Sequence, residues 1–533
     1  MSNLFTYDGQ RALLDQRHER VYEDVPTLPE QISFDRAIST LHYPEIENYL
    51  EGRPDKDVVS HIADEIVPAL SGQKRSSRYY GFVTGGVLPI AEWADNVVTM
   101  MDQNVQVHLP DQSISTRVED VTLRMMLNLL NLGDEGAGEK PDDRWKGRTF
   151  TTGATSSNIL GLACGREETL YKALRGEGSV AELGLLGACR KVGVKEIQVL
   201  TSSAHSSLSK AASVVGLGRS SIKELPLSEK EPWRLDLEAL EMRLETPGTV
   251  SIIAISAGEV NTGRYSTRGG EMRIIRDLAD KYGAWVHVDG AFGIFARALE
   301  RTEQYEVLHR GVEGLELADS ITVDGHKLLN VPYDCGMFFT RSHEVLESVF
   351  VNPNAAYLAP SLPSAPTRSA SSGSASSRST SSGEYMIPSP LHIGLENSRR
   401  FRALPAYAVL VNEGRPGIAS LLANMIELSR KVAAFLQGSM YYELLPDQGS
   451  DLDEIFMIVL FRAVRPELND KLVNSINKTR QMYVSETKWK GQKAVRMAVS
   501  TWMVDVERDY KIVKDILTNV AEGREFDIMR FRG

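Results

Sequence analysis

One stretch, residues 250–289, restricts the fold of this chain more than any other. It contains an apolar run (VSIIAIS), then a helical run (EMRIIRDLADKYG), then a second apolar run (AWVHVD). Strand, helix and strand in this order form a βαβ unit, whose strands are parallel and whose crossover is right-handed. A further apolar run, VKEIQVLT at residues 194–201, predicts another such strand. The sequence therefore predicts an α/β protein with a mostly parallel sheet.

The bulk properties of the chain exclude several classes of protein. Its 533 residues are enough for two or more domains, and its net charge of −11 leaves no basic surplus for nucleic acid. The three cysteines fit neither a disulfide framework nor a zinc site, which favours a reducing compartment. Residues 1–20 lack the apolar segment of a secretory signal, and no apolar run approaches the roughly 20 residues of a membrane-spanning helix. We expect a soluble, cytoplasmic protein.

Lys327 is the first candidate for chemistry. It lies in SITVDGHKLLNVPYDCGMFFTR, residues 320–341, after an Asp-Gly turn and between two apolar runs. A lysine beside buried strands is expected to be partly desolvated, which favours the neutral amine and makes it a usable nucleophile. An amine with a histidine beside it suits covalent attachment of pyridoxal phosphate (PLP) as a Schiff base. The alternative for Lys327 is a solvated turn residue.

Asp289 is the second candidate. It follows the apolar run WVHV, at the carboxyl end of a predicted strand, where open α/β sheets bind their ligands. A carboxylate there is suited to keep the pyridine nitrogen of PLP protonated, and only the protonated ring withdraws electrons well. The alternative for Asp289, taken alone, is a helix N-cap.

With both stretches in view, the chain resembles the group II PLP-dependent amino-acid decarboxylases, which include aromatic-amino-acid, glutamate, histidine and cysteine-sulfinate decarboxylases. The resemblance implies a PLP-dependent transferase of fold type I that converts an L-amino acid to its amine and CO₂, with PLP held on Lys327. Five motifs carry it, in the order of the family: TTGATSSN (151–158), SSAHSSLSKAA (202–212), HVDGAFG (287–293), DGHKLLNVPYDCG (324–336) and SRRFRALP (398–405).

The resemblance also implies which residues surround PLP. Hydroxyl residues at a helix start suit a phosphate dianion, and relatives bind the PLP phosphate at the corresponding place. At position 154 this chain has alanine where a serine is common in relatives. The family's histidine stacks on the cofactor ring and orients the substrate carboxylate, a role that falls to His205. Asp324-Gly325 differs from the Asn-Pro pair of many relatives. The implied cofactor-binding residues are Ala154, Thr155, Ser156, His205, Ser256, Asp289, Ala291, His326 and Lys327.

Substrate contacts are implied in three other places. Tyr80 and Phe82 lie in an aromatic, glycine-rich stretch that would form a wall of the substrate pocket, or else a turn that buries aromatic residues. Arg399 is the candidate for the substrate carboxylate, unless it belongs to a solvated helix start. The family carries a loop tyrosine that returns a proton to the substrate carbon, and Tyr385 is favoured over Tyr357 for that catalytic role.

The predicted domains follow from these assignments. Residues 1–75 are predicted to form an N-terminal helical segment, which the resemblance implies packs against a partner subunit in a homodimer, and residues 76–345 are predicted to form the large PLP-binding domain. Residues 346–397 form a mobile catalytic loop that includes a Ser-rich tract, which lacks apolar area to offset the entropy of ordering. Residues 398–533 form a small α+β domain.

Other functions remain open at this point. The same fold supports decarboxylation coupled to oxidative deamination, desulfuration or aldol cleavage. His205 and a loop tyrosine favour simple decarboxylation over the oxidative reaction. Product analysis with O₂ monitoring distinguishes these reactions. A PLP-fold scaffold without catalysis is the alternative of a different class, and the absorbance of the purified protein distinguishes it. A nucleotide-binding enzyme is disfavoured because the chain has neither a GxGxxG nor a GxxxxGK[ST] motif.

Overall fold

The computed structural model describes residues 26–45, 50–133, 140–352, 387–449 and 451–531. They form two compact units. The larger unit contains residues 87–423 and 453–456, and the smaller contains the described parts of 1–86, 424–452 and 457–533. Within the described residues, no helix is long and apolar enough to cross a membrane.

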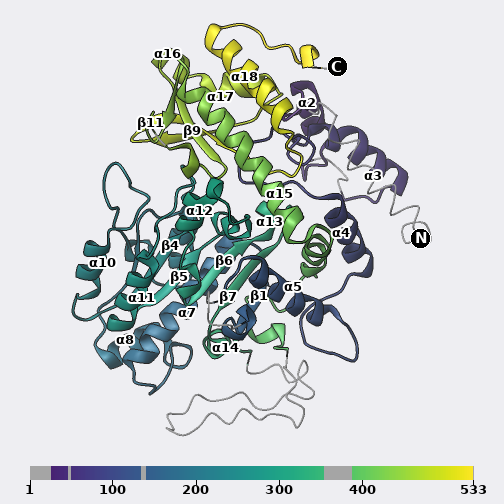
Figure 1. Ribbon diagram of the computed structural model, residues 1–533. Coiled ribbons are helices and arrows are strands. Elements are labelled where there is room, and N and C mark those ends of the chain that lie inside the picture. Colours follow the sequence, from purple (N-terminus) through teal and green to yellow (C-terminus); the bar gives the residue numbers. More distant parts are fainter. Residues whose placement is uncertain (1–25, 46–49, 134–139, 353–386, 450, 532–533) are drawn as a thin grey trace. The chain divides into compact units, whose positions relative to one another are not determined.

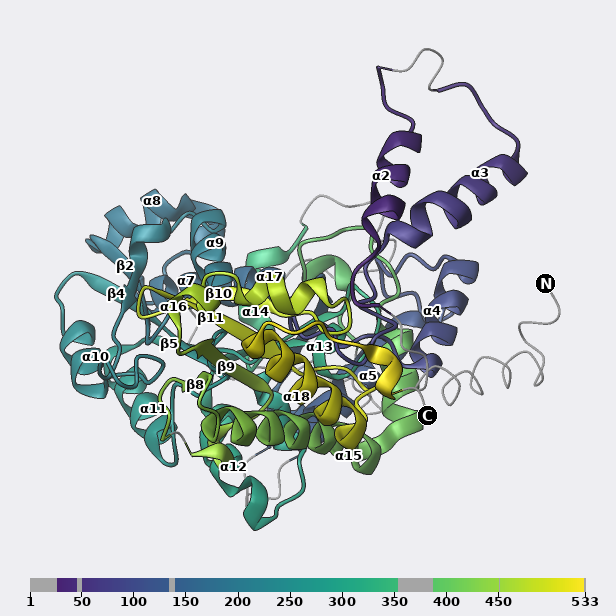
Figure 2. The same cartoon turned by 90° about the horizontal axis from the view of Figure 1, so that it is seen from above.

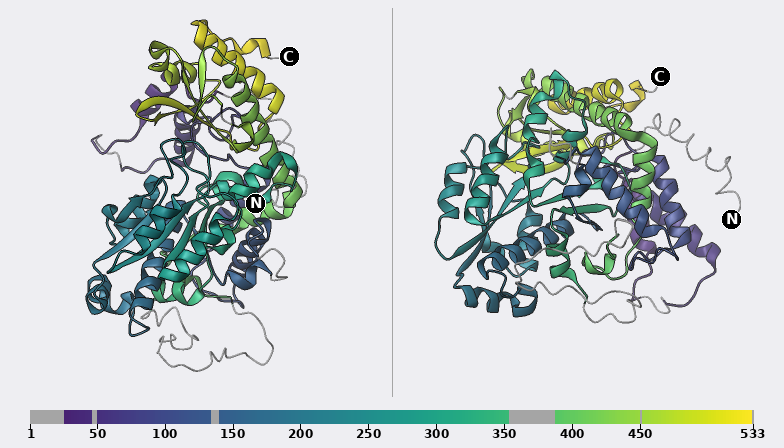
Figure 3. Two further views of the ribbon diagram at one scale, coloured as in Figure 1. Left: turned by 60° about the vertical axis from the view of Figure 1, so that its left-hand side comes forward. Right: turned by 60° about the horizontal axis from the view of Figure 1, so that its bottom comes forward.

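The larger unit is built on a seven-stranded sheet with the order β1-β7-β6-β5-β4-β2-β3. Neighbours from β3 through β2, β4 and β5 to β6 are parallel, whereas β7 is antiparallel to both β6 and β1. The mostly parallel sheet is therefore confirmed, and Figure 1 and the left view of Figure 3 show its strands side by side in blue to teal. The strands are β1 (Gly147–Thr151), β2 (Glu196–Thr201), β3 (Ile222–Glu224), β4 (Thr249–Ser256), β5 (Trp285–Asp289), β6 (Ser320–Asp324) and β7 (Gly336–Thr340).

The helices of this unit connect and cover the strands. Several begin at a capping side chain: Asp236 accepts hydrogen bonds from the first N–H groups of α10, and Ser342 accepts one in α14. The helix α11 ends at Gly283 with a left-handed φ of 71°, which favours glycine. The helices are α4 (Pro89–Met101), α5 (Ser115–Leu129), α6 (Pro141–Arg144), α7 (Ala154–Ala173), α8 (Val180–Val192), α9 (Ser206–Val214), α10 (Leu237–Leu244), α11 (Glu271–Tyr282), α12 (Glu306–Gly311), α13 (Gly325–Leu328) and α14 (His343–Phe350). The long helix α15 (Ala403–Gln437) begins in this unit and ends in the other.

Helix α7 packs directly on the sheet, against β4, β5, β6 and β7. Alternation along β5 places Trp285 and His287 on one face, together with Asp289. A Cβ atom at Gly161 would collide with the His287 ring, and one at Gly165 would lie 2.8 Å from Cδ1 of Trp285. These two glycines therefore let the helix approach the strand closely enough to bury both side chains.

The smaller unit combines segments from both ends of the sequence. The backbone N–H of Thr27 donates to the carbonyl of Arg480, and that of Tyr80 donates to Tyr483. Its antiparallel sheet has the order β10-β11-β9-β8 and its helices α17 and α18 lie side by side, as Figure 2 shows. Its elements are α2 (Gln31–Thr40), α3 (Asp55–His61), β8 (Tyr442–Leu445), β9 (Ile458–Ala463), α16 (Pro466–Asn469), α17 (Leu472–Lys478), β10 (Ser485–Trp489), β11 (Gln492–Ala498) and α18 (Val506–Glu522).

The division into units differs from the predicted domains. The sequence assigned residues up to 75 to a separate helical segment and residues 76–86 to the large domain. In the structure Thr27, Arg78 and Tyr80 share backbone hydrogen bonds with residues 480–498, and both stretches belong to the smaller unit. The predicted boundary at residue 398 also shifts, because the first part of α15 belongs to the larger unit. Pairing between distant segments decides the first of these boundaries, and no local sequence signal reports such pairing.

Candidate active site

Six strands of the larger unit end at one edge of the sheet. The strands β2, β3, β4, β5 and β6 are parallel, and β1 runs in the same direction because β7 is antiparallel to both β1 and β6. Their carboxyl ends therefore share this edge. The ends of these strands and the segments that follow them carry all nine predicted cofactor residues: Ala154, Thr155 and Ser156 after β1, His205 after β2, Ser256 at the end of β4, Asp289 at the end of β5, Ala291 after it, and His326 and Lys327 after β6.

Asp289 is held in place from two sides. Its Oδ2 accepts a hydrogen bond from Nδ2 of Asn158 at 2.8 Å, and its Oδ1 accepts one from the N–H of Ala291 at 3.3 Å. In the strand register Asp289 pairs with Ser256 of β4 on one side and with Thr322 of β6 on the other. The predicted carboxylate thus has a fixed orientation at the carboxyl edge.

Asn158 is itself oriented by buried donors. Its Oδ1 accepts hydrogen bonds from Nε2 of His287 and from Oγ1 of Thr322, both at 3.0 Å. Burial lowers the pKa of His287 to about 4, so the ring is neutral and carries one proton. Its Nδ1 lies 2.8 Å from Oγ of Ser320. The amide group of Asn158 therefore presents its nitrogen to Asp289.

His205 joins the same network. It precedes α9, and its Nδ1 accepts from the N–H of Ser207 at 3.2 Å and lies 2.5 Å from Oγ of Ser207. Oγ of Ser207 in turn accepts from Nδ2 of Asn158 at 3.2 Å. His205 is exposed, and its Nδ1 is fixed by the protein.

The start of α7 lies against the turn after β6. Gly153 has a φ of 144°, and a Cβ atom there would lie 3.1 Å from Cε1 of His326 and 3.7 Å from Oδ1 of Asp324. The N–H groups of the first helical turn have no acceptor inside a helix, so those of Ala154, Thr155 and Ser156 are available to an anion. The helix start and His326 are therefore brought together.

Lys327 lies in α13, the short helix after β6. Its Nζ is 2.9 Å from Oδ2 of Asp324 and 5.9 Å from the centroid of the Phe292 ring. The side chain of Lys327 is 21% exposed and that of Asp324 only 2% exposed. The structure thus places a carboxylate beside Nζ, and the nucleophilic role of Lys327 stays a prediction. The sequence did not predict this contact. Asp324 and Lys327 are three residues apart, and their side chains come together only because the chain forms a helical turn here.

The other predicted residue of this turn, His326, is fixed by its neighbours. Its Nδ1 accepts from the N–H of Cys335 at 3.2 Å, and its ring centroid lies 4.5 Å from that of Tyr333. Nε2 is 3.5 Å from Oδ2 of Asp324. Burial lowers the pKa of His326, so its ring is a neutral donor through Nε2.

Arg399 has a protein partner in this structure. Its Nη1 and Nη2 bind Oε1 and Oε2 of Glu119 at 2.8 and 2.6 Å, and both side chains are buried. Burial raises the pKa of Glu119, while Arg399 opposes that rise. The geometry therefore gives no support to a role in binding the substrate carboxylate, and that role stays a prediction.

The remaining predicted substrate residues lie elsewhere. Tyr80 is fully buried and Phe82 is 54% exposed, and both belong to the smaller unit. Burial raises the pKa of the Tyr80 hydroxyl well above its ordinary value. Tyr385 and Tyr357 lie outside the described residues. The substrate roles of all four stay predictions.

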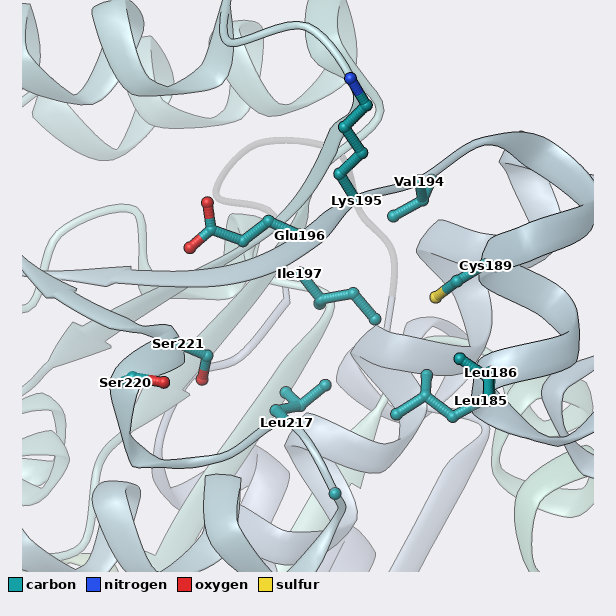
Figure 4. Close-up of a pocket in the computed structure, with 11 residues that line it drawn as sticks. Leu185, Leu186, Cys189, Val194, Lys195, Glu196, Ile197, Leu217, Ser220 and Ser221 are labelled. Carbon is teal, nitrogen blue, oxygen red and sulfur yellow. The ribbon is translucent and has the colours of Figure 1, made fainter.

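A hollow of about 420 Å³ lies at the opposite edge of the same sheet. Glu196, the first residue of β2, lines it together with Leu185, Ile197 and Leu217, as Figure 4 shows. Its position at the amino ends of the strands separates it from the site at the carboxyl edge. Among the described residues, no group of histidine, cysteine and carboxylate side chains is arranged to hold a metal ion.

Comparison with known proteins places these observations in a family. The model of the family described as "Pyridoxal-dependent decarboxylase conserved domain" matches residues 56–370. An L-2,4-diaminobutyrate decarboxylase of Acinetobacter baumannii is 27% identical over 337 residues, which cover 62% of this chain and 58% of that protein. The chain therefore aligns with little more than half the length of this relative.

Two solved structures share the fold. The tryptophan decarboxylase of Catharanthus roseus, in complex with L-tryptophan, superposes with a TM-score of 0.73 at 17% identity, covering 97% of this chain and 98% of that one. The 4-hydroxyphenylacetaldehyde synthase of Rhodiola rosea superposes with a TM-score of 0.72 at 17% identity, covering 97% of both chains.

Proposed function

Because the chain belongs to the family of pyridoxal-dependent decarboxylases, we propose that it removes the carboxyl group of an L-amino acid as CO₂ and releases the amine. The observation that supports this best is the placement of Asp289 at the end of β5 and of Lys327 after the neighbouring parallel strand β6. An amine and an oriented carboxylate at one sheet edge are the two groups that PLP chemistry requires of a protein.

The residues at this edge fit PLP. The cofactor supplies an aldehyde that bonds to amines and a protonated ring that withdraws electrons. Lys327 would hold the aldehyde carbon, and Asp289 would hold the proton of the ring nitrogen. The N–H and hydroxyl groups of the α7 start, with Nε2 of His326, would bind the phosphate. Ser256 and Ala291, beside Asp289 in the register and the loop, would line the ring.

Asn158 supports Asp289 in this role. Because Asn158 donates to Asp289 and is held by two buried donors, the carboxylate cannot turn away from the edge without breaking these bonds. His205, exposed at the same edge and fixed through Ser207, would cover the ring and orient the substrate carboxylate. Orientation decides the reaction, since the bond that breaks must stand perpendicular to the ring.

The proton that returns to the substrate carbon would come from Tyr385, with Tyr357 as the alternative. This assignment rests on the sequence, because the family's tyrosine shortly precedes the motif at residues 398–405. Arg399 would bind the substrate carboxylate only if it gave up its two hydrogen bonds to Glu119 and donated to that carboxylate instead. Tyr80 and Phe82 would contact the substrate side chain.

We further propose that the protein is a cytoplasmic homodimer. Support for the dimer comes from large apolar side chains exposed along the N-terminal helices, which in a stable protein usually mark a contact surface. They include Ile32 at 73%, Val59 at 65% and Leu70 at 62% exposure. The three cysteines are unpaired, as expected in a reducing compartment.

A second candidate is decarboxylation coupled to oxidative deamination, because an aldehyde synthase shares the fold. One experiment tests both. The purified protein with PLP is incubated with a panel of amino acids while CO₂, amine, aldehyde and O₂ are followed. Amine with CO₂ and no O₂ uptake supports the main proposal, whereas aldehyde with O₂ uptake supports the second. Tyr385→Phe should shift products toward aldehyde, and amine as the sole product would assign the proton to another residue.

A further inference from the structure

Arg402, the last arginine of the motif at residues 398–405, forms a two-pronged ion pair with Asp334. Its Nε donates to Oδ1 of Asp334 at 2.8 Å, and its Nη2 donates to Oδ2 at 3.2 Å. Nη2 also donates to Oε1 of Glu396 at 3.2 Å. The side chain of Arg402 is 7% exposed and that of Asp334 is 34% exposed. Because a planar guanidinium that binds both carboxylate oxygens fixes their orientation, Asp334 is held in place by a buried cation.

Asp334 lies in the loop from α13 to β7, and both of its neighbours in the chain contact His326. The N–H of Cys335 donates to Nδ1 of His326 at 3.2 Å, and the carbonyl of Cys335 accepts from the N–H groups of Gly325 and His326 at 2.8 and 3.2 Å. A Cβ atom at Gly325 would lie 2.9 Å from Sγ of Cys335. On the other side, the ring centroid of Tyr333 lies 4.5 Å from that of His326. The loop that Arg402 holds therefore packs directly on His326.

These contacts decide which nitrogen of His326 can donate to a ligand. Since Nδ1 accepts from the N–H of Cys335, the proton of the imidazole ring lies on Nε2. The same side of the ring faces the start of α7, because a Cβ atom at Gly153 would lie 3.1 Å from Cε1 and 3.8 Å from Nε2 of His326. A shift of the loop would take away the donor to Nδ1 and let the ring turn or move its proton. The position of Cys335 therefore sets the direction of the Nε2–H group.

We propose that the ion pair of Arg402 and Asp334 positions His326 to donate to the phosphate of PLP. The proposal rests on the proposed function, in which Nε2 of His326 is one of the donors to that phosphate. Arg402 is a positioning residue, because it acts on His326 only through Asp334 and the adjoining backbone of Cys335. Its task thus differs from the one predicted for Arg399, the contact with the substrate carboxylate.

The first test is the affinity of the full chain for PLP, measured by absorbance titration after the cofactor has been removed. Loss of a hydrogen bond to a charged group lowers affinity by about tenfold or more, so Asp334→Asn and Arg402→Gln should each weaken PLP binding by about tenfold. The double variant should bind no more weakly than the weaker single variant, because the two side chains act as one unit. Asp280→Asn is the matched control and should bind PLP like wild type, since Asp280 lies 2.8 Å from Arg276 in α11, away from this edge.

Two further measurements separate positioning from a general loss of stability. In a His326→Gln background, Asp334→Asn should weaken PLP binding no further, because its effect passes through His326. At saturating PLP, the phosphorus NMR shift of the bound cofactor should differ between wild type and Asp334→Asn, because the phosphate loses a donor. A change in stability alone would leave that shift as it is in wild type. Asp334→Glu keeps the carboxylate and should retain most of the affinity.

The outcomes distinguish this proposal from the proposed function. Suppose that wild type carries PLP on Lys327 and the variants match it in affinity and phosphorus shift. The positioning role is then wrong, and the proposed function stands. A further loss of affinity in the His326→Gln background would also overturn the positioning role. If wild type carries no PLP on Lys327, the proposed function itself fails. Should Arg402→Gln not fold, Asp334→Asn decides, because that side chain is partly exposed and the substitution preserves its shape.

Discussion

Asn158 connects four side chains at the carboxyl edge of the sheet. It donates to Asp289 and Ser207 and accepts from His287 and Thr322. Each buried polar atom of the amide thus has a partner, which is how proteins avoid the cost of an unsatisfied buried group. Asn158 therefore determines where the carboxylate of Asp289 points.

The neutral state of His287 predicts how stability depends on pH. Its pKa is about 4 in the folded chain and about 6.5 when unfolded, so the unfolded chain binds the proton more tightly. The free energy of unfolding that the neutral His287 contributes is therefore fully present above pH 6.5 and is lost as the pH falls toward 4. The difference of roughly 2.5 pKa units corresponds to about 3 kcal/mol.

Urea unfolding of wild type and His287→Gln at several pH values measures this effect. The glutamine side chain takes up no proton, so the free energy of unfolding of the variant should fall less steeply between pH 6.5 and 4. Equal slopes for the two proteins would show that His287 does not carry the effect.

At the scale of residues, the sequence indicated side chains at the ends of strands more readily than the side chains that support them. Lys327, Asp289 and His205 follow predicted strands, and strand ends are readable from apolar runs. Asn158 was read only as part of a motif, because its four contacts come from three different elements. The partner of Arg399, Glu119, lies 280 residues away, which no local pattern reveals.

At the scale of elements, the packing of α7 on β5 rests on glycine. Gly161→Ala places a methyl group against the buried ring of His287, and overpacking of this kind typically costs about 1–3 kcal/mol. The matched control is Gly187→Ala in α8, where the new methyl group meets nothing closer than 3.6 Å and alanine is the better helix former. Thermal unfolding should show a lower midpoint for the first variant and an equal or higher midpoint for the second. A Gly161→Ala variant as stable as wild type would contradict the close packing.

The sequence predicted the βαβ core because its two strands are apolar runs and the segment between them is a helical run. It did not predict that β7 lies between β1 and β6 and runs antiparallel to both. The pairing of β1 with β7 joins residues 147–151 to 336–340, and such long-range pairing depends on the whole sheet.

At the scale of the whole molecule, the chain is proposed to pair through its N-terminal helices. Sedimentation velocity should show wild type as a dimer of the 59.1 kDa chain and Ile32→Glu combined with Val59→Glu as a monomer. Both side chains are largely exposed in α2 and α3. The control is Leu186→Glu, since Leu186 is 64% exposed in α8, and it should leave the dimer intact. A double variant that still sediments as a dimer would place the interface elsewhere.

The central claim concerns the covalent attachment of PLP to Lys327. The most direct test is peptide mass spectrometry of the PLP-saturated protein after borohydride reduction, together with CO₂ release by wild type and Lys327→Ala. The account predicts the added cofactor mass on the peptide that contains Lys327, and no turnover in the alanine variant. Cofactor found on a different lysine, or CO₂ release that survives in Lys327→Ala, would contradict it.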